Sequence, residues 1–457
     1  MSSATEVPGS FIAQASEGRR TVLDITGLAR WIGPAVGILR VEQALATYAL
    51  NQPSNIVLAY YDRAVGAFLA VNPRWAEHIV SWQGSVGRRR PMPLNLLPST
   101  YSAVGLLERW HDASGSDRVA SMIETMQRVV LLTRRRRRRG VVPFRLALGR
   151  PLTLSPRDTV LFVGSDWTNK DTAAIAALKT RLGFRYAVVC HDIIPLLFPQ
   201  YFSQADVGAF RRFWLDMFGI ADQILVASQR VAHDIVQYCA AHDIRHVECR
   251  RVPLGSDVTG YGANVGLPEG LEADRFILFV STIEPRKNHA LLLRVWQRLL
   301  AENVPQRDGF KLVLVGRPGW HCDDILEQIK DKTRFSGSLV HLTGVRDEEL
   351  AALYRAAAFC VYPSRYEGFG LPVIEAFANG KAVIASSGGA LAETVGGLSP
   401  RLDPDDEEAW FTTMKAWIAN AASRAPFEAA IRSGFAPVSW DRAASEIFAA
   451  LTEGETR

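Results

Sequence analysis

The stretch YPSRYEGFGLPVIEAFANG, residues 362–380, decides the fold because it joins a strand end, a glycine turn and a helix start. An apolar run over residues 359–362 predicts a buried strand that ends where this stretch begins. Helical spacing starts at Leu371, and Pro372 falls in the first turn, where its missing N–H costs nothing. Gly380 is the expected helix stop. The pattern places Glu367 at a strand tip and Glu375 one turn inside the helix.

The turn between these two acids is suited to an anion. Its backbone N–H groups lie at the positive end of a helix, where a diphosphate can bind, and a carboxylate on either side can accept hydrogen bonds from hydroxyl groups. An ordinary strand-to-helix turn could carry the same glycines. The turn fails as a dinucleotide fingerprint, because Val373 stands where a third glycine or alanine is needed.

Length and composition indicate a two-domain soluble protein. A chain of 457 residues is too long for one core and predicts two domains of roughly 200 residues each. Residues 1–20 lack the apolar core of a signal peptide and are expected to be disordered. The most apolar window, residues 276–280, is far too short to span a membrane. Five scattered cysteines without metal spacing predict reduced thiols and a cytoplasmic location.

The net charge of +5 is unevenly placed. Residues 88–90 are arginines, and a run of six arginines begins at Arg134 and ends at Arg139. The simpler interpretation is a solvated extension of a helix over residues 118–132. The alternative is docking to an anionic membrane surface or a phosphorylated acceptor, with each arginine contributing about 1 kcal/mol near such a surface. Nucleic acid is disfavoured because no aromatic residues interleave with the arginines.

Strands alternate with helices in two blocks, which predicts two parallel sheets covered on both faces. The expected domains are residues 21–257 and 275–436, joined by a linker over 258–274, with a last helix in 437–457 that crosses back to the first domain. Expected strands are 21–25, 55–61, 160–163, 186–190 and 223–227, then 276–280, 311–315, 339–342, 359–362 and 382–385. Ligands of such sheets bind outside the carboxyl ends of the strands.

Four segments of the second half resemble the retaining glycosyltransferases of family 4. They are STIEPRKNH (281–289), VLVG (313–316), HLTGV (341–345) and EGFGLPVIEA (367–376). Two shorter segments of the first half, VGILRV (36–41) and CHDIIP (190–195), also resemble that family. The resemblance implies an α/β chain with the GT-B fold, in which two Rossmann-like domains face each other, and it implies a sugar-nucleotide donor.

The resemblance also implies a role for each matched residue. Glu367 would face the donor sugar and Glu375 the ribose hydroxyls, while Arg286 and Lys287 would bind the diphosphate. His191 would lie near the 6-hydroxyl of the sugar. The remaining donor-binding candidates are Ser281, Val345, Phe369, Gly370 and Leu371, and Gly37 and Asp192 are candidates on the acceptor side.

Two positions depart from the family pattern. Ser281 stands where many members have an arginine, so Arg286 is expected to serve instead. The segment LAE (391–393) replaces the usual Pro-Glu. The segment DPD (403–405) superficially resembles a metal-binding motif, but it lies outside the strand ends, so a solvated surface and a metal-free site are expected.

The expected reaction is transfer of a hexose from a nucleoside diphosphate to a glycan or lipid-linked glycan. Fixed cations and a helix N-terminus would meet the charge on the departing phosphate, and Glu367 would stabilise the oxocarbenium-like centre. Same-face attack and a covalent intermediate both remain open. The EPRKNH form of the lysine motif is most similar to bacterial mannosyltransferases that use GDP-mannose in surface-polysaccharide assembly. UDP-glucose, GDP-fucose and a non-catalytic glycan-binding scaffold are the alternatives, and a Rossmann oxidoreductase is disfavoured.

Overall fold

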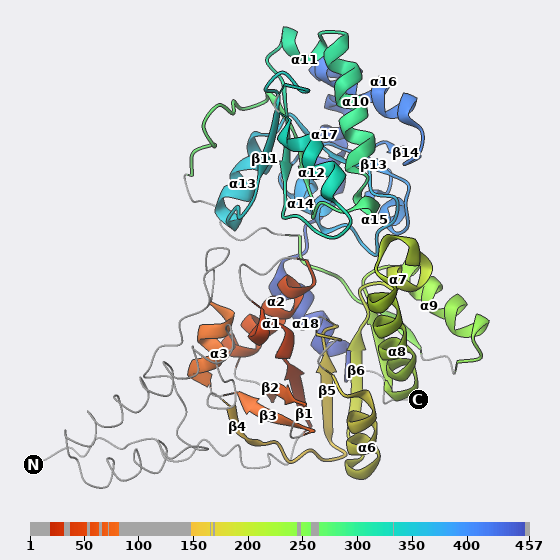
Figure 1. Cartoon of the computed structure of the whole chain (residues 1–457). Coiled ribbons are helices and arrows are strands. Elements are labelled where there is room, and N and C mark those ends of the chain that lie inside the picture. The colour runs from red at the N-terminus through yellow and green to blue at the C-terminus, as the bar shows by residue number, and fades with distance from the viewer. Residues whose placement is uncertain are drawn as a thin grey trace, which may run out of the picture.

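The computed structural model describes residues 19–31, 37–52, 55–63, 66–71, 73–81, 148–164, 166–167, 170–244, 248–256, 265–331 and 333–452. Both arginine runs and the predicted helix over residues 118–132 lie outside the described residues. The described residues form two α/β domains, shown one above the other in Figure 1. None of the helices in these ranges is both long and apolar enough to cross a membrane.

The first domain is built on an eight-stranded sheet with the order β4-β3-β2-β1-β5-β6-β7-β8. Its strands are β1 (Arg20–Asp24), β2 (Ile56–Asp62), β3 (Ala67–Val71), β4 (Leu148–Pro151), β5 (Asp158–Phe162), β6 (Arg185–Val189), β7 (Gln223–Val226) and β8 (Cys249–Arg251). Its helices are α1 (Thr26–Arg30), α2 (Ile38–Asn51), α3 (Pro73–Val80), α6 (Thr172–Leu182), α7 (Ile194–Leu197), α8 (Gln204–Ile220) and α9 (Gln229–Ala241).

One edge of this sheet differs from the expected parallel arrangement. Strand β3 pairs antiparallel with β2, and β4 pairs antiparallel with β3. Only residues 63–66 separate β2 from β3, and so short a connection can join antiparallel strands but cannot make a parallel crossover. The strands from β2 through β1 and β5 to β8 are parallel, as expected.

Apolar residues cover both faces of the first sheet. Adjacent residues of β1 enter different clusters: Leu23 packs with α1, α2 and α3, whereas Val22 packs with α6, α8 and α9. Successive side chains of a strand point to opposite faces, so a strand that is apolar throughout requires helices on both sides. This is the doubly wound architecture that the alternating pattern predicted.

The second domain is built on a six-stranded, wholly parallel sheet with the order β11-β10-β9-β12-β13-β14. Its strands are β9 (Phe276–Val280), β10 (Lys311–Val315), β11 (Leu339–Leu342), β12 (Phe359–Tyr362), β13 (Val383–Ser386) and β14 (Arg401–Leu402). Its helices are η5 (Pro285–Lys287), α10 (His289–Ala301), α11 (Val304–Arg307), α12 (Asp323–Lys330), α13 (Asp347–Ala356), α14 (Leu371–Ala378), α15 (Leu391–Val395), α16 (Glu407–Ala419), η6 (Ala421–Ser423) and α17 (Ala425–Gly434).

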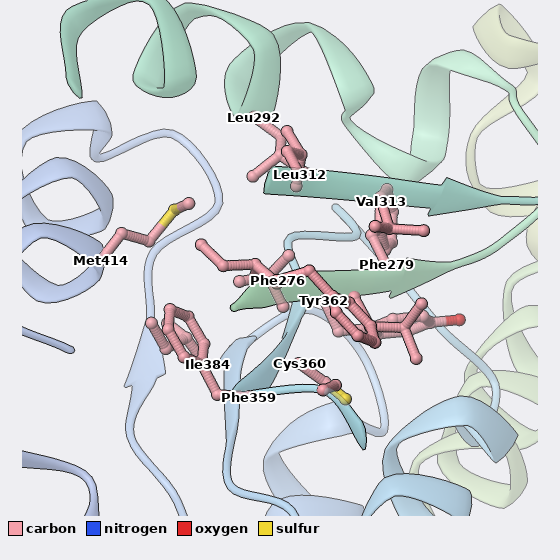
Figure 2. Close-up of a cluster of buried hydrophobic side chains, with 14 of the residues drawn as sticks. Phe276, Phe279, Leu292, Leu312, Val313, Phe359, Cys360, Tyr362, Ile384 and Met414 are labelled. Atoms are coloured by element: carbon pink, nitrogen blue, oxygen red, sulfur yellow. The ribbon is translucent and has the colours of Figure 1, made fainter. Parts of the chain in front are cut away.

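The core of this second domain is one continuous cluster of buried side chains. Figure 2 shows Phe276, Phe279 and Phe359 on its central strands, and Leu292 of α10 and Met414 of α16 belong to the same cluster. Burying a large apolar side chain contributes about 1.5–3 kcal/mol. The cluster therefore fixes strands β9 and β12, whose ends carry the charged residues described below.

The last helix, α18 (Trp440–Ala450), returns to the first domain. In Figure 1 it lies beside α2, and the rings of Tyr48 in α2 and Phe448 in α18 stack with centroids 5.7 Å apart. Ala444 and Ile447 of α18 are buried in the core of the first domain. The chain thus crosses between the domains twice, as expected of the predicted fold.

Candidate active site

The strand order of the second domain contains a switch point. Strand β9 pairs with β10 on one side and with β12 on the other, so the order of the chain reverses between β9 and β12. In open parallel sheets, ligands bind at such a switch point, outside the carboxyl ends of the strands. The segment after β9 carries Arg286 and Lys287, and the segment after β12 carries Glu367.

These three side chains form a buried cluster of ion pairs. The Lys287 Nζ lies 2.5 Å from Glu367 Oε1, and an Arg286 guanidinium nitrogen lies 3.0 Å from Glu367 Oε2. Arg286 also pairs with Glu284 at 2.6 Å, and Lys287 donates a 3.1 Å hydrogen bond to the Tyr362 hydroxyl. Each of these charged side chains is at most 12% exposed. The structure therefore brings the two predicted cations and the predicted acid together.

The cluster keeps Glu367 ionised. Burial alone would raise the pKa of Glu367, but the charges of Arg286 and Lys287 outweigh it and lower that pKa to about 2. Burial and the neighbouring Arg286 lower the pKa of Lys287. Burial raises the pKa of Glu284. With two cations and two carboxylates, the cluster is balanced in charge, and it holds a carboxylate at the strand end that can face a cationic reacting centre.

The turn after Glu367 requires glycine at two positions. Gly370 caps α14 with φ +100°, a conformation that L side chains rarely adopt, and a Cβ there would lie 2.6 Å from the Leu391 Cδ2. A Cβ on Gly368 would lie 2.4 Å from the His191 carbonyl oxygen of the first domain. The turn residues Phe369 and Leu371 pack against the apolar core of the first domain. The turn therefore lies at the contact between the domains.

Glu375 lies in a different group of contacts from Glu367. Its Oε1 pairs with Arg40, which comes from α2 of the first domain, and its Oε2 accepts a 2.9 Å hydrogen bond from the buried Tyr354 hydroxyl. Arg40 also reaches Asp347 at 2.9 Å. Although burial opposes it, the charges of Glu375 and Asp347 raise the pKa of Arg40. The carboxylate predicted for the ribose is thus held by an arginine across the domain boundary.

The first domain contributes the loop after β6 to the same region. The His191 Nε2 lies 2.7 Å from the Val163 carbonyl oxygen, and burial lowers the pKa of His191, which favours the neutral ring. The Asp192 carboxylate accepts a 3.0 Å hydrogen bond from the backbone N–H of Ile194 at the start of α7. A Cβ on Gly368 would also lie 2.8 Å from Asp192 Cβ. His191 and Asp192 therefore lie directly against the turn that follows Glu367.

The other predicted site residues lie around this centre. Ser281 follows β9, and its hydroxyl lies 3.3 Å from the His289 Nε2. Val345, after β11, is partly buried against the core of the second domain. Gly37 caps α2 with φ +53°, and a Cβ there would have open space. None of these three takes part in the ion pairs of Glu367 or Glu375 that the structure gives.

Several residues of the region escaped the sequence reasoning because they act across the domains. Ser228 donates a 2.7 Å hydrogen bond to the Gly368 carbonyl oxygen. The Glu393 carboxylate accepts hydrogen bonds from the backbone N–H groups of Gln229 and Arg230, at the first turn of α9. Tyr366 donates to Asp234. Arg40 belongs to the segment VGILRV (36–41), which resembles the family. The spacing of residues within that segment does not reveal its partner Glu375, which lies 335 positions away.

No group of three or more His, Cys, Asp or Glu side chains in the described ranges has the arrangement of a metal site. In the DPD segment, Asp405 is 67% exposed and pairs with Arg365, and the Asp403 carboxylate accepts a 2.8 Å hydrogen bond from the Asp405 backbone N–H. These contacts are those of a solvated turn. Metal-free chemistry stays a prediction.

Comparison with known proteins gives a family for the second domain. Residues 274–420 match the family described as "Glycosyl transferases group 1". Over 134 residues the chain is 42% identical to "O-antigen chain mannosyltransferase B" of Escherichia coli, an alignment that covers 29% of this chain and 34% of that protein. The chain thus spans about a third of the length of this relative, and the similarity to the glycosyltransferase family is carried by residues 274–420.

Solved structures give the fold of the whole chain. Sucrose-phosphate synthase from Thermosynechococcus elongatus matches with a TM-score of 0.57 at 17% identity, covering 95% of this chain and 98% of its own. Anabaena Alr3699/HepE, solved in complex with UDP and glucose, also has a TM-score of 0.57, at 16% identity, covering 95% and 100%. The chain has the GT-B fold of two Rossmann-like domains.

Proposed function

We propose that this chain, whose residues 274–420 match the glycosyl transferases group 1 family, is a retaining hexosyltransferase that uses a nucleotide-sugar donor. The donor would bind at the switch point of the second sheet, and the acceptor would enter from the first domain. The observation that carries the proposal is the buried cluster in which Arg286 and Lys287 pair with Glu367, directly against the His191 loop.

The leaving group explains why this cluster suits the reaction. When the bond between the sugar C1 and the phosphate oxygen breaks, negative charge develops on the diphosphate. Arg286, Lys287 and the backbone N–H groups at the start of α14 are fixed in position to stabilise that charge. The side chains of Arg286 and Lys287 are buried, so solvent screens their electrostatic attraction to the phosphate only weakly. No metal is required for this stabilisation.

Glu367 would act on the positive charge that develops on the sugar ring. Its depressed pKa keeps it ionised, and a carboxylate beside an oxocarbenium-like centre stabilises it. In same-face attack, the acceptor oxygen forms the new bond to C1, and its proton passes to the departing phosphate oxygen. Alternatively, Glu367 attacks C1 and releases the nucleoside diphosphate. The acceptor oxygen then displaces Glu367 from C1, and its proton passes to the released diphosphate. Both routes retain the configuration, and we favour the first.

We infer GDP-mannose as the donor and a glycan or lipid-linked glycan of a surface polysaccharide as the acceptor. The support is the EPRKNH motif and the 42% identity, over 134 residues, to a protein named as an O-antigen chain mannosyltransferase. UDP-glucose and GDP-fucose are the donors to test against it.

The deciding experiment follows donor hydrolysis by NMR in the presence of GDP-mannose, UDP-glucose and GDP-fucose, one at a time. We expect mannose release from GDP-mannose and retention of the α configuration at C1 in any transferred product. Turnover of another donor alone would overturn the GDP-mannose assignment but keep the transferase. No turnover and no nucleotide binding with any donor would overturn the transferase and leave a glycan-binding scaffold.

We propose a cytoplasmic protein that docks on the inner face of a membrane through the six arginines from Arg134 to Arg139. Replacing all six by serine should weaken binding to liposomes that contain anionic lipid, most clearly at low salt, because salt screens exposed charges. A sedimentation assay with neutral liposomes is the control. Equal binding of the parent and the variant would show that the arginines are solvated surface.

A further inference from the structure

The ion pair between Arg40 and Glu375 holds the carboxylate that the family resemblance assigns to the ribose of the donor. The pair crosses the domain boundary. It joins the first turn of α2, in the first domain, to the second turn of α14, in the second domain. Glu375 is 4% exposed, and its other oxygen is taken by the Tyr354 hydroxyl. Ribose hydroxyls that donate to this carboxylate must therefore compete with Arg40.

We propose that Arg40 is a latch that joins the two domains through Glu375 and that the ribose of a bound nucleotide displaces this latch. The proposal rests on the proposed function and on the ribose contact that the family resemblance implies for Glu375. The guanidinium of Arg40 pairs with two carboxylates, those of Glu375 and Asp347. When the ribose binds, its hydroxyls satisfy Glu375, and Arg40 keeps Asp347 as a partner.

The geometry favours a latch over a fixed structural pair. Arg40 binds its two carboxylates from the first turn of α2, whose cap is Gly37 with φ +53° and no packing around a Cβ. The Asp347 side chain is 26% exposed and already pairs with Arg40. After release from Glu375, the Arg40 side chain can therefore keep this partner with little rearrangement. A buried ion pair contributes little net stability because desolvation offsets the attraction, so exchanging one partner for hydroxyl donors is feasible.

The expected effect is an increase in nucleotide affinity when the latch is removed. The measurement is titration calorimetry with GDP, and with UDP for comparison. Arg40→Ala should bind the nucleotide on the order of tenfold more tightly than the parent. The reason is that close charge pairs across an interface can couple by about 1.5 kcal/mol or more. Asp347→Asn should bind the nucleotide more weakly than the parent, because Arg40 released from Glu375 then lacks the carboxylate that would hold it. Arg346→Ala is the matched control, because Arg346, at the N-cap of α13, pairs only locally with Glu349 among the ion pairs of the described residues, and the affinity should not change.

The latch also predicts a change of shape. Small-angle X-ray scattering of the nucleotide-free proteins should show a larger radius of gyration for Arg40→Ala than for the parent and for Arg346→Ala. Weaker nucleotide binding by Arg40→Ala would overturn the latch and make Arg40 a ligand of the donor. An unchanged affinity together with an unchanged radius would overturn it as well.

The two proposals can fail separately. If neither nucleotide binds to any of the proteins, the proposed donor and the competition for Glu375 are both wrong. The scattering result still decides whether Arg40 holds the domains together. A thermal melt of each variant shows whether it is folded, and Asp347→Asn keeps the test open if Arg40→Ala is not.

Discussion

At the scale of single residues, the buried Glu367 cluster shows why its members depend on one another. Removing one partner of a buried ion pair leaves an uncompensated charge and typically costs 3–5 kcal/mol, whereas the intact pair adds little. Arg286 and Lys287 both rely on the same carboxylate. The balance of charge around this acid therefore contributes to the stability of the fold.

We predict that Glu367→Gln lowers kcat by about 100-fold or more, because the amide cannot stabilise positive charge on the sugar. The variant should still bind GDP, since Arg286 and Lys287 remain. The measurement is steady-state transfer with the donor found by NMR, with calorimetry of GDP binding beside it. Glu408→Gln, at a side chain that is 68% exposed, is the control and should keep full activity. Wild-type rates for Glu367→Gln would remove this residue from the mechanism.

The same substitution changes the response of the fold to acid. The pKa of Glu367 is about 2 in the folded chain, below its ordinary value near 4.5, so the unfolded chain takes up this proton first. The stability that Glu367 contributes is present above about pH 4.5 and is lost as the pH falls toward 2. Thermal melts between pH 6 and 3 should therefore show a shallower loss of stability for Glu367→Gln than for the parent.

The local part of this site was predictable from sequence, and the distant part was not. Lys287, Arg286 and Glu367 follow strand ends, and parallel strands end at one edge of a sheet, so their meeting follows from the pattern. The partner of Glu375 is different, because it comes from Arg40 in the other domain. Strand order within one sheet says nothing about how two sheets face each other, so no local pattern could indicate that pair.

At the scale of elements, α14 shows how a helix start is specified by backbone and packing together. Gly370 supplies the left-handed cap, Pro372 follows in the first turn, and Glu375 lies one turn further. The expected strands of the second sheet agree with the observed ones to within a residue, because each is a short buried apolar run. Strands β3 and β4 were not predicted. They form the antiparallel edge of the first sheet, and neither strand is a run of β-branched residues that would indicate it in the sequence.

We predict that Gly370→Ala destabilises the second domain more than Gly380→Ala does. Both glycines have positive φ, and placing an L residue in that region costs about 1–2 kcal/mol. Only Gly370 has a neighbour in the way, because a Cβ there would lie 2.6 Å from Leu391 Cδ2, whereas the space at Gly380 is open. Urea unfolding of both variants measures the difference. Equal losses of stability would show that Leu391 moves aside at no cost.

At the scale of the whole molecule, the two domains meet through contacts gathered around the turn after Glu367. Gly368 lies against the backbone of His191 and accepts a hydrogen bond from Ser228, while Glu393 binds the first turn of α9. The contacts from the first domain come from loops after β6 and β7, at the same edge of that sheet. The closed arrangement thus depends on the absence of a side chain at Gly368.

We predict that Gly368→Ala holds the domains apart and lowers kcat/KM by about 100-fold, since a displacement near 1 Å can cost that much. The added Cβ would lie 2.4 Å from the His191 carbonyl oxygen, which belongs to the backbone and cannot turn away. Because the φ of Gly368 is not positive, the alanine itself adopts the native backbone, and each domain should stay folded.

The control for Gly368→Ala is Gly219→Ala in α8, where a Cβ meets nothing within 4 Å. That change should raise stability by roughly 0.5–1 kcal/mol, as replacing a helical glycine does, and leave activity intact. Scattering should then show a larger radius of gyration for Gly368→Ala alone, with thermal melts of both variants close to the parent. Full activity and an unchanged radius for Gly368→Ala would mean that the two loops accommodate the added Cβ without separating the domains, and the prediction would be wrong.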